Sequence, residues 1–191
     1  MSMHWPAKGP ANTDATIQAA LARARELGIK RVIVASHRGH TAEKLAAHAA
    51  GDAGLADLEI VCVTHQAGFA KPGEDEMSPE MRAKLTAAGV KLLTTTHLLA
   101  GIDRALRFKF QGIYPSEIVA ATLRLLGQGV KVCAEIAGMA ADAGLTPPGE
   151  DVVCIAGSAT GADTACVISP AHSQHFFDLK IREIICKPRD F

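Results

Sequence analysis

Residues 32–50 read VIVASHRGHTAEKLAAHAA. The apolar start of this stretch is typical of a buried strand, and its alanine-rich end is typical of a helix. A turn that runs from Ser36 to Thr41 joins the two. A strand that passes through a short turn into a helix is the repeating unit of sheets with parallel strands.

The same alternation recurs on both sides of this stretch. Apolar spacing predicts a helix over 12–28, and further strand and helix patterns follow along the chain. We expect strands at 31–35, 59–63 and 90–93, with helices at 41–50 and 78–88 between them. Strands that alternate with helices of this length favour a parallel sheet that is covered on both faces.

The second half of the chain is organised differently. Three helical patterns come first, at 96–106, 116–126 and 129–143, and three closely spaced strand patterns follow at 152–156, 164–168 and 183–187. The short connections between these strands predict that one of them runs antiparallel to the others. We therefore expect a three-layer α/β/α fold with a mixed, mostly parallel sheet, as a single domain over residues 1–191.

Composition narrows the class of protein. The chain has 20 Lys and Arg against 20 Asp and Glu, so it lacks the basic field expected of a nucleic-acid or membrane-surface protein. There is neither a long apolar segment nor a signal peptide, and the five cysteines include no CxxC pair. We expect a cytoplasmic protein with reduced thiols and with no nucleic-acid or membrane partner.

The turn after the first predicted helix–strand pair is the best candidate for a binding site. It contains hydroxyls, an arginine and a glycine directly before a helix, which suits a phosphate. The candidate residues are Ser36, His37, Arg38, Gly39, His40 and Thr41. Walker A and GxGxxG motifs are absent. The alternative is that Ser36 or Thr41 only caps the helix.

Two further predicted strands end in polar residues. Thr64 and His65 follow one of them, and Thr96 and His97 follow the other. Loops at the carboxyl ends of neighbouring parallel strands converge on one crevice, so these side chains are expected to face the ligand held by Arg38. The histidines could supply or accept a proton. Alternatively, each of them caps a local helix or loop.

A glycine-rich loop between the last strands could form a second cradle. Its candidate residues are Gly157, Gly161, Asp163 and Thr164. Because a carboxylate repels phosphate, we assign Asp163 to a ribityl or ribose hydroxyl. The loop could equally be a long hairpin turn whose glycines permit positive φ.

Metal binding is the main competing interpretation. The pairs His37–His40 and His172–His175 both have the spacing HxxH, and Asp178 follows the second pair. A zinc site needs three or four ligands, and neither a cysteine pair nor HExxH accompanies the histidines. We expect no bound metal, and we expect His172 and His175 to organise the turn before residues 176–179.

Long segments of the chain resemble a known family. VIVASHRGHTA at 32–42 resembles the effector-phosphate loop of the pyruvate kinase C-terminal domain. KGPANTDATI at 8–17, VTHQAGFAKPGEDEMSP at 63–79 and GVKLLTTTHLLAG at 89–101 extend the likeness, as do most residues from 112 to 189. The whole chain is similar to stand-alone archaeal and bacterial proteins classed as pyruvate kinase C-terminal-domain-like.

The resemblance implies a fold, a ligand and the residues that hold it. It implies a three-layer α/β/α fold without the catalytic barrel of pyruvate kinase, so no pyruvate kinase activity is expected. It also implies that flavin mononucleotide (FMN) binds, with its phosphate at Ser36, Arg38, Gly39 and Thr41. His37 departs from the smaller hydroxyl residue expected there. Candidates for stacking on the flavin ring are Trp5, Phe69, Phe108, Phe110 and Tyr114, with the loop 110–114 as first choice. Alternatively, these aromatic residues fill the core or a subunit contact.

Three functions follow as hypotheses. The first is a protein that binds a phosphorylated small molecule, with FMN foremost. The second is a flavin-dependent oxidoreductase in which His65 or His97 supplies a proton. The third is a ligand-sensing regulatory protein that works as a homo-oligomer. The apolar helix at 129–143 makes an oligomer plausible, although packing inside the monomer explains that helix equally well.

Overall fold

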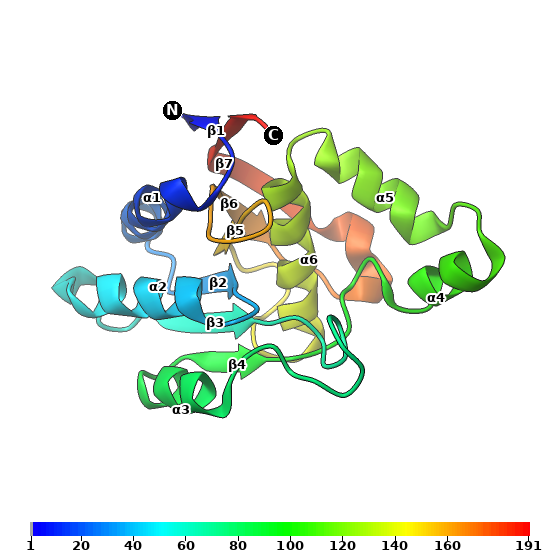
Figure 1. Cartoon of the computed structure of the whole chain (residues 1–191). Helices are drawn as coiled ribbons and strands as arrows, with labels where there is room; N and C mark the ends of the chain where they lie inside the picture. Colours follow the sequence, from blue (N-terminus) through cyan, green and yellow to red (C-terminus); the bar gives the residue numbers. More distant parts are fainter. Residues whose placement is uncertain (1) are drawn as a thin grey trace.

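A computed structural model describes residues 2–191, and its centre is one seven-stranded mixed sheet (Figure 1). The strand order is β1-β7-β6-β5-β2-β3-β4. The strands are β1 (Met3–Ala7), β2 (Arg31–Ala35), β3 (Glu59–Val63), β4 (Lys91–Leu93), β5 (Val152–Ala156), β6 (Thr164–Ser169) and β7 (Lys180–Asp190). β6 is antiparallel to both β5 and β7, whereas all other neighbouring strands are parallel. The predicted mixed sheet with one antiparallel strand is confirmed.

Helices cover both faces of the sheet. The α-helices are α1 (Thr13–Leu27), α2 (His40–Ala50), α3 (Pro79–Ala87), α4 (Gly101–Phe110), α5 (Pro115–Arg124) and α6 (Gln128–Asp142). Short 3₁₀ helices lie at Pro10–Asn12, Ala53–Leu55 and Ser173–Asp178. No helix of residues 2–191 is long and apolar enough to span a bilayer.

The side chains of β2 point alternately to the two faces of the sheet and contribute to a hydrophobic core on each face. Val32 and Val34 pack with residues of α1, α2 and α3 on one face, whereas Ile33 packs with residues of α6 on the other. Successive side chains of a strand point to opposite faces, so an entirely apolar strand requires cover on both sides. The three-layer α/β/α architecture is therefore confirmed.

α6 is buried within the chain, as its apolar pattern predicted. Twelve of its fifteen residues are buried, and it packs against β5 and β6. Gly129 permits the close approach, because a Cβ there would lie 2.1 Å from Thr164 Oγ1. Packing inside the monomer therefore accounts for this helix, and its apolar surface is no evidence for a subunit contact.

Three elements differ from the predictions, and one of them is β7, which spans Lys180–Asp190 where a strand was expected at 183–187. β1 was not predicted, because its five residues are exposed or half-buried and include Pro6, and such a strand lacks an apolar pattern. The helix expected at 96–106 begins at Gly101, after a loop that carries His97. α4 and α5 form a hairpin that projects beside the sheet (Figure 1). Of the residues in these two helices, only Ala120 is buried.

Candidate functional site

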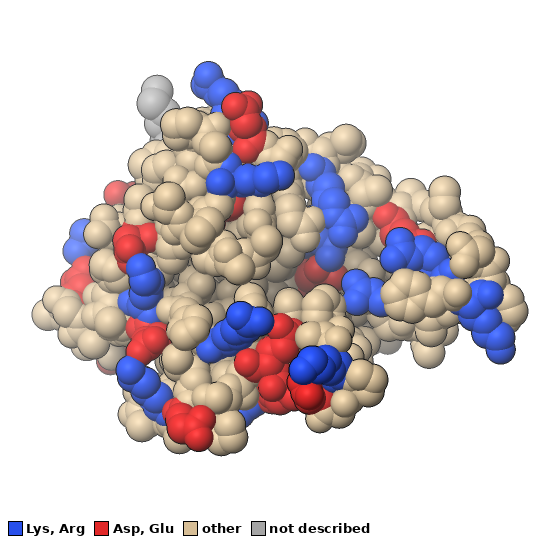
Figure 2. All heavy atoms as spheres, in the orientation of Figure 1, with Lys and Arg blue, Asp and Glu red and all other residues tan. Residues whose placement is uncertain are grey.

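A cavity of about 370 Å³ opens at the carboxyl ends of β2 and β3. This volume lies in the range of small-molecule sites. Loops that follow β2, β3, β4 and β5 contribute to its lining, and α6 and two arginines of the α4–α5 hairpin complete it. Figure 2 shows a hollow on this face with both basic and acidic side chains around it. The predicted convergence of loops at one crevice is thus seen in the structure.

The loop after β2 forms one wall of the cavity. Ser36 is buried, and its Oγ accepts hydrogen bonds from the backbone N–H groups of Thr41 at 3.2 Å and Ala42 at 3.4 Å. Ser36 therefore does cap helix α2, as the simpler interpretation held. Its own hydroxyl hydrogen remains available as a donor. Ser36, His37, Arg38, His40 and Thr41 all line the cavity.

Gly39 gives this loop its shape without lining the cavity. Its φ is +91°, and a Cβ there would lie 2.4 Å from Cγ of Met81 on α3. Only glycine adopts this conformation at low cost and permits the contact. The turn thereby places Arg38 two residues before the start of α2, and Arg38 has no carboxylate partner among residues 2–191.

Four rings form the wall next to this loop. The ring centroids of His37 and His65 are 4.8 Å apart and the rings are stacked. The centroid of His65 lies 4.1 Å from that of Phe69 and 5.2 Å from that of His97. All four residues line the cavity. The arrangement offers a planar ligand ring several faces and edges to pack against.

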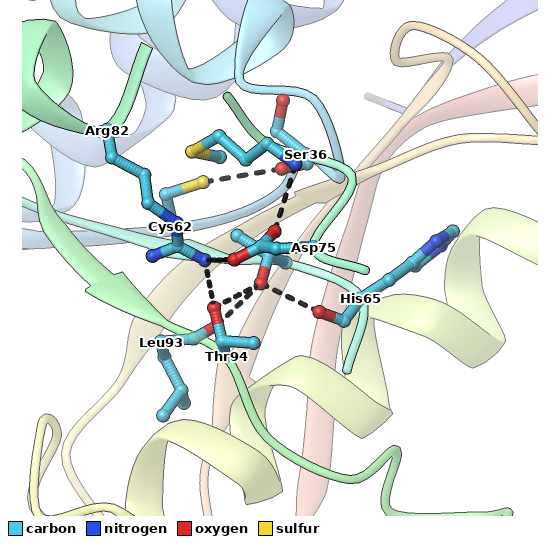
Figure 3. Close-up of polar contacts among 9 residues, drawn as sticks. Ser36, Cys62, His65, Asp75, Arg82, Leu93 and Thr94 are labelled. Atoms are coloured by element: carbon cyan, nitrogen blue, oxygen red, sulfur yellow. Dashed lines mark hydrogen bonds and ion pairs between the residues drawn. The ribbon is translucent and has the colours of Figure 1, made fainter. Parts of the chain in front are cut away.

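The loop between β3 and α3 contacts His65 and is itself fixed by hydrogen bonds and an ion pair. Glu76 Oε2 lies 2.6 Å from Nδ1 of His65. Asp75 accepts from the backbone N–H of Met77 at 2.9 Å and pairs with Arg82 of α3. In Figure 3 the imidazole of His65 points away from this network of Asp75, Arg82 and Thr94. Because Nδ1 of His65 interacts with Glu76, Nε2 is the ring nitrogen through which His65 can exchange a proton with a ligand.

Thr64 has a structural role in the same region. Its Oγ1 lies 2.7 Å from Oγ1 of Thr94 and donates to the carbonyl of His65 at 2.9 Å. Arg82 donates to Thr94 Oγ1 at 2.6 Å (Figure 3). Thr64 lines the cavity but chiefly ties the ends of β3 and β4 together.

Burial keeps two of the histidines neutral. The pKa of His97 is lowered to about 4, chiefly by burial; Glu135 opposes this effect, and charges at His65, Arg104 and Lys131 add to it. Burial also lowers the pKa of His37, and charge on His65 adds to this effect. At neutral pH both rings therefore present uncharged surfaces to the cavity.

The wall opposite the Ser36–Thr41 loop was not predicted as part of the site. It is built from α6 and the α4–α5 hairpin, and it contains Arg104, Arg124, Gln128, Lys131 and Glu135. Lys131 and Glu135 are less than a tenth exposed and form an ion pair one turn apart. Lys131 and Glu135 are two charged residues four positions apart in an otherwise largely apolar helix, and this pattern is the signal that could have found them.

The glycine-rich loop between β5 and β6 is only partly a cavity loop. Gly157, Ala159, Thr160 and Gly161 line the cavity, and Ala159 has the unusual φ of +101°. Asp163 does not line it, which corrects the assignment of its carboxylate to a ligand hydroxyl.

The carboxylate of Asp163 is fully buried and serves the fold. It accepts hydrogen bonds from the backbone N–H groups of Gly9 at 3.1 Å and Ser158 at 3.2 Å, and from the Thr164 hydroxyl at 2.8 Å. Thr164 is buried and also lies outside the lining. Asp163 and Thr164 therefore belong to a structural turn between β5 and β6, as the alternative interpretation of this loop held.

Other predicted residues lie elsewhere. Thr96 is exposed and outside the cavity lining, and Phe110 and Tyr114 are likewise outside it, so Phe69 replaces the 110–114 loop as the stacking candidate. His172 and Ser173 contact Asp142, in keeping with a role in the turn. Among residues 2–191, no three His, Cys, Asp or Glu residues are grouped as a metal site would need.

Comparison with known proteins identifies the family. The family model "Pyruvate kinase, alpha/beta domain" matches residues 14–168. Two pyruvate kinase structures from Cryptosporidium parvum, one of them in complex with ADP, are 17–18% identical to this chain. They align over 84–85% of it with TM-scores of 0.40 and 0.41, and the chain covers 24% of their length. The chain belongs to the pyruvate kinase alpha/beta domain family.

Proposed function

We propose that the cavity binds a phosphorylated ligand that carries a planar ring, and that FMN is its foremost candidate. The observation that supports this most directly is the position of the four-ring wall beside the Ser36–Thr41 loop. A phosphate at this loop would meet Arg38 and the Ser36 hydroxyl at the positive end of the α2 dipole, while the N–H groups of Thr41 and Ala42 stay bound to Ser36 Oγ. The ring of the same ligand would then lie against Phe69 and His65. Pyruvate kinase activity is not part of the proposal.

Ligand-induced stabilisation tests the proposal. The purified protein is heated with and without FMN, and a ligand at a hundred times its Kd should add about 2.7 kcal/mol to the free energy of unfolding. Arg38→Met should weaken FMN binding at least tenfold, because it removes a charged partner of the phosphate. Arg189→Met, on β7 outside the cavity, is the matched control. Absence of any FMN binding to the unmodified protein would reject FMN, and equal binding by both variants would reject the phosphate site.

The paired His65 and Glu76 favour one second candidate, a flavin-dependent oxidoreductase. A carboxylate 2.6 Å from Nδ1 orients an imidazole for proton transfer through its other nitrogen. His65 is therefore the better candidate than His97, which burial keeps neutral. Stopped-flow mixing of the FMN-loaded protein with NADH or NADPH should bleach the flavin absorbance. No bleaching with either donor would remove this candidate.

The α4–α5 hairpin supports the proposal of a homo-oligomer. It and the following turn expose large apolar side chains: Ile102, Phe108, Phe110, Ile113, Ile118, Leu125 and Leu126. An apolar patch of this kind commonly marks a surface that another chain covers. Light scattering with and without FMN would measure the assembly, and a change on adding FMN would favour the regulatory function. A monomer under both conditions would reject the oligomer.

A further inference from the structure

The ion pair of Lys131 and Glu135 lines the cavity, and a contribution to stability does not by itself explain why these two charges are buried there. Both side chains are less than a tenth exposed, on a helix that is otherwise largely apolar. Burying two charges costs several kcal/mol per ion, and apolar residues of similar volume are often as stable. A buried pair that also lines a cavity is therefore a candidate for ligand recognition.

Glu135 is held in place and retains capacity to accept hydrogen bonds. Its Oε1 accepts from the backbone N–H of Leu99 at 3.0 Å, and its Oε2 accepts from Lys131 Nζ. An ionised carboxylate offers about four acceptor positions, so about two remain for a ligand. Glu135 is also the only carboxylate among the described residues that line the cavity. Hence a donor group of the ligand has one well-defined charged acceptor.

Two cationic donors, Lys131 and Arg104, line the same cavity as that acceptor. Lys131 contacts it directly, and Arg104 enters from the hairpin with its Cζ 5.4 Å from the centroid of Phe69. Arg104 lines the same cavity as Lys131 and Glu135, on the side where Phe69 lies 5.1 Å from His97 between ring centroids. Arg104 has no carboxylate partner among residues 2–191 and donates only. The wall thus presents donors around one acceptor, next to the ring wall.

We propose that Lys131, Glu135 and Arg104 recognise an imide edge, –CO–NH–CO–, on the ring of the phosphorylated ligand. An imide presents acceptor, donor and acceptor in turn, which complements lysine, carboxylate and arginine. A ring with an amino group in place of one carbonyl would set its N–H groups against a cation and lose that acceptor. The ligand class is then a phosphate ester of a sugar or sugar alcohol whose attached ring system contains a pyrimidinedione. This inference rests on the proposed function, because it requires the phosphate at the Ser36–Thr41 loop.

Removal of one N–H group from the probe tests the proposal. FMN and N3-methyl-FMN differ only at the imide nitrogen, and both carry the phosphate. Calorimetry should show FMN binding at least tenfold more tightly, because methylation leaves Glu135 without its donor and adds bulk at the contact. FMN binding that is lost in Arg38→Met but equal for the two probes would overturn the imide assignment and leave the proposed function intact. Absence of binding by both probes would overturn the two together.

Substitutions attribute the discrimination to the three residues. Glu135→Gln should reduce the preference for FMN over N3-methyl-FMN to less than threefold, since the neutral amide is a weaker acceptor. Arg104→Met, on the exposed hairpin, avoids the risk that a change in α6 disrupts folding. It should weaken FMN binding about tenfold, whereas Lys109→Met on the same helix, outside the cavity, should not change it. Arg104→Met without effect on FMN binding would overturn the role of Arg104.

Nucleotides provide an independent probe of the same edge. Uridine monophosphate has a ring carbonyl where cytidine monophosphate has an amino group, and its adjacent ring nitrogen carries an N–H that cytidine monophosphate lacks. Thermal shift should show greater stabilisation by the uridine nucleotide in the unmodified protein and an equal, small effect of both in Glu135→Gln. Equal stabilisation of the unmodified protein by the two nucleotides would contradict recognition of the imide.

Discussion

The loop after β2 and the loop between β5 and β6 look alike in sequence and differ in the structure. Both combine glycine with hydroxyl side chains, and both contribute to the cavity. In the first, Arg38 has no carboxylate partner and the Ser36 hydroxyl keeps a free hydrogen. In the second, Asp163 is fully buried and accepts three hydrogen bonds from within the protein. Glycine and hydroxyl content therefore does not reveal which loop holds a ligand; the partners of the polar groups do.

The largest effect is expected from Asp163→Ala in the second loop. The substitution leaves the N–H groups of Gly9 and Ser158 and the Thr164 hydroxyl without their buried acceptor, and the cost should be at least about 3 kcal/mol. Urea denaturation of both proteins measures it. FMN affinity, measured under conditions where the variant is folded, should stay within about threefold of the original. A large change in FMN affinity with an unchanged free energy of unfolding would show that the second loop binds the ligand and that Asp163 is not needed for the fold.

Gly39→Ala in the first loop should come next, at about 2 kcal/mol. The alanine would have to adopt a φ of +91° and place its Cβ against Met81. Gly73→Ala is the matched control, because Gly73 has a φ of +78° and a Cβ added there would meet nothing within 4 Å. The difference between the two losses, from chemical denaturation, isolates the packing against Met81. Equal losses would mean that backbone strain alone requires this glycine.

Ser36→Ala should cost about 1 kcal/mol. The substitution removes the oxygen that accepts from the N–H groups of Thr41 and Ala42 at the start of α2. The proposed function predicts weaker FMN binding as well, because the hydroxyl hydrogen is lost as a donor to the phosphate. Thermal unfolding with and without FMN separates the two effects. A loss of stability with unaltered FMN affinity would confine Ser36 to capping.

The smallest effect on stability is expected from Arg38→Met. Arg38 is exposed and has no carboxylate partner among residues 2–191, so the free energy of unfolding should change by less than about 0.5 kcal/mol. Urea titration of the ligand-free variant tests this expectation. A loss above about 1 kcal/mol would show that Arg38, like Asp163, belongs to the framework of the fold.

The sequence predicted the sheet better than it predicted the cavity. Strands at 31–35 and 59–63 coincide with β2 and β3, because continuous apolar runs between turns report burial on two faces directly. Arg104 and Arg124 could not be recognised, since only the three-dimensional path of the hairpin brings them to the cavity. Asp163 was misassigned because its partner Gly9 lies far away in the sequence. Local patterns identify elements, whereas the partners of a polar group depend on tertiary structure.

The pairing of β1 with β7 has a consequence for biosynthesis. Met3 lies opposite Cys186, so the partner of β1 emerges from the ribosome only after the other six strands of the sheet have been made. Until β7 has been made, β1 has no strand to pair with. Closure of this edge is therefore a late, long-range event, and β5, β2, β3 and β4 can assemble around α6 before it happens.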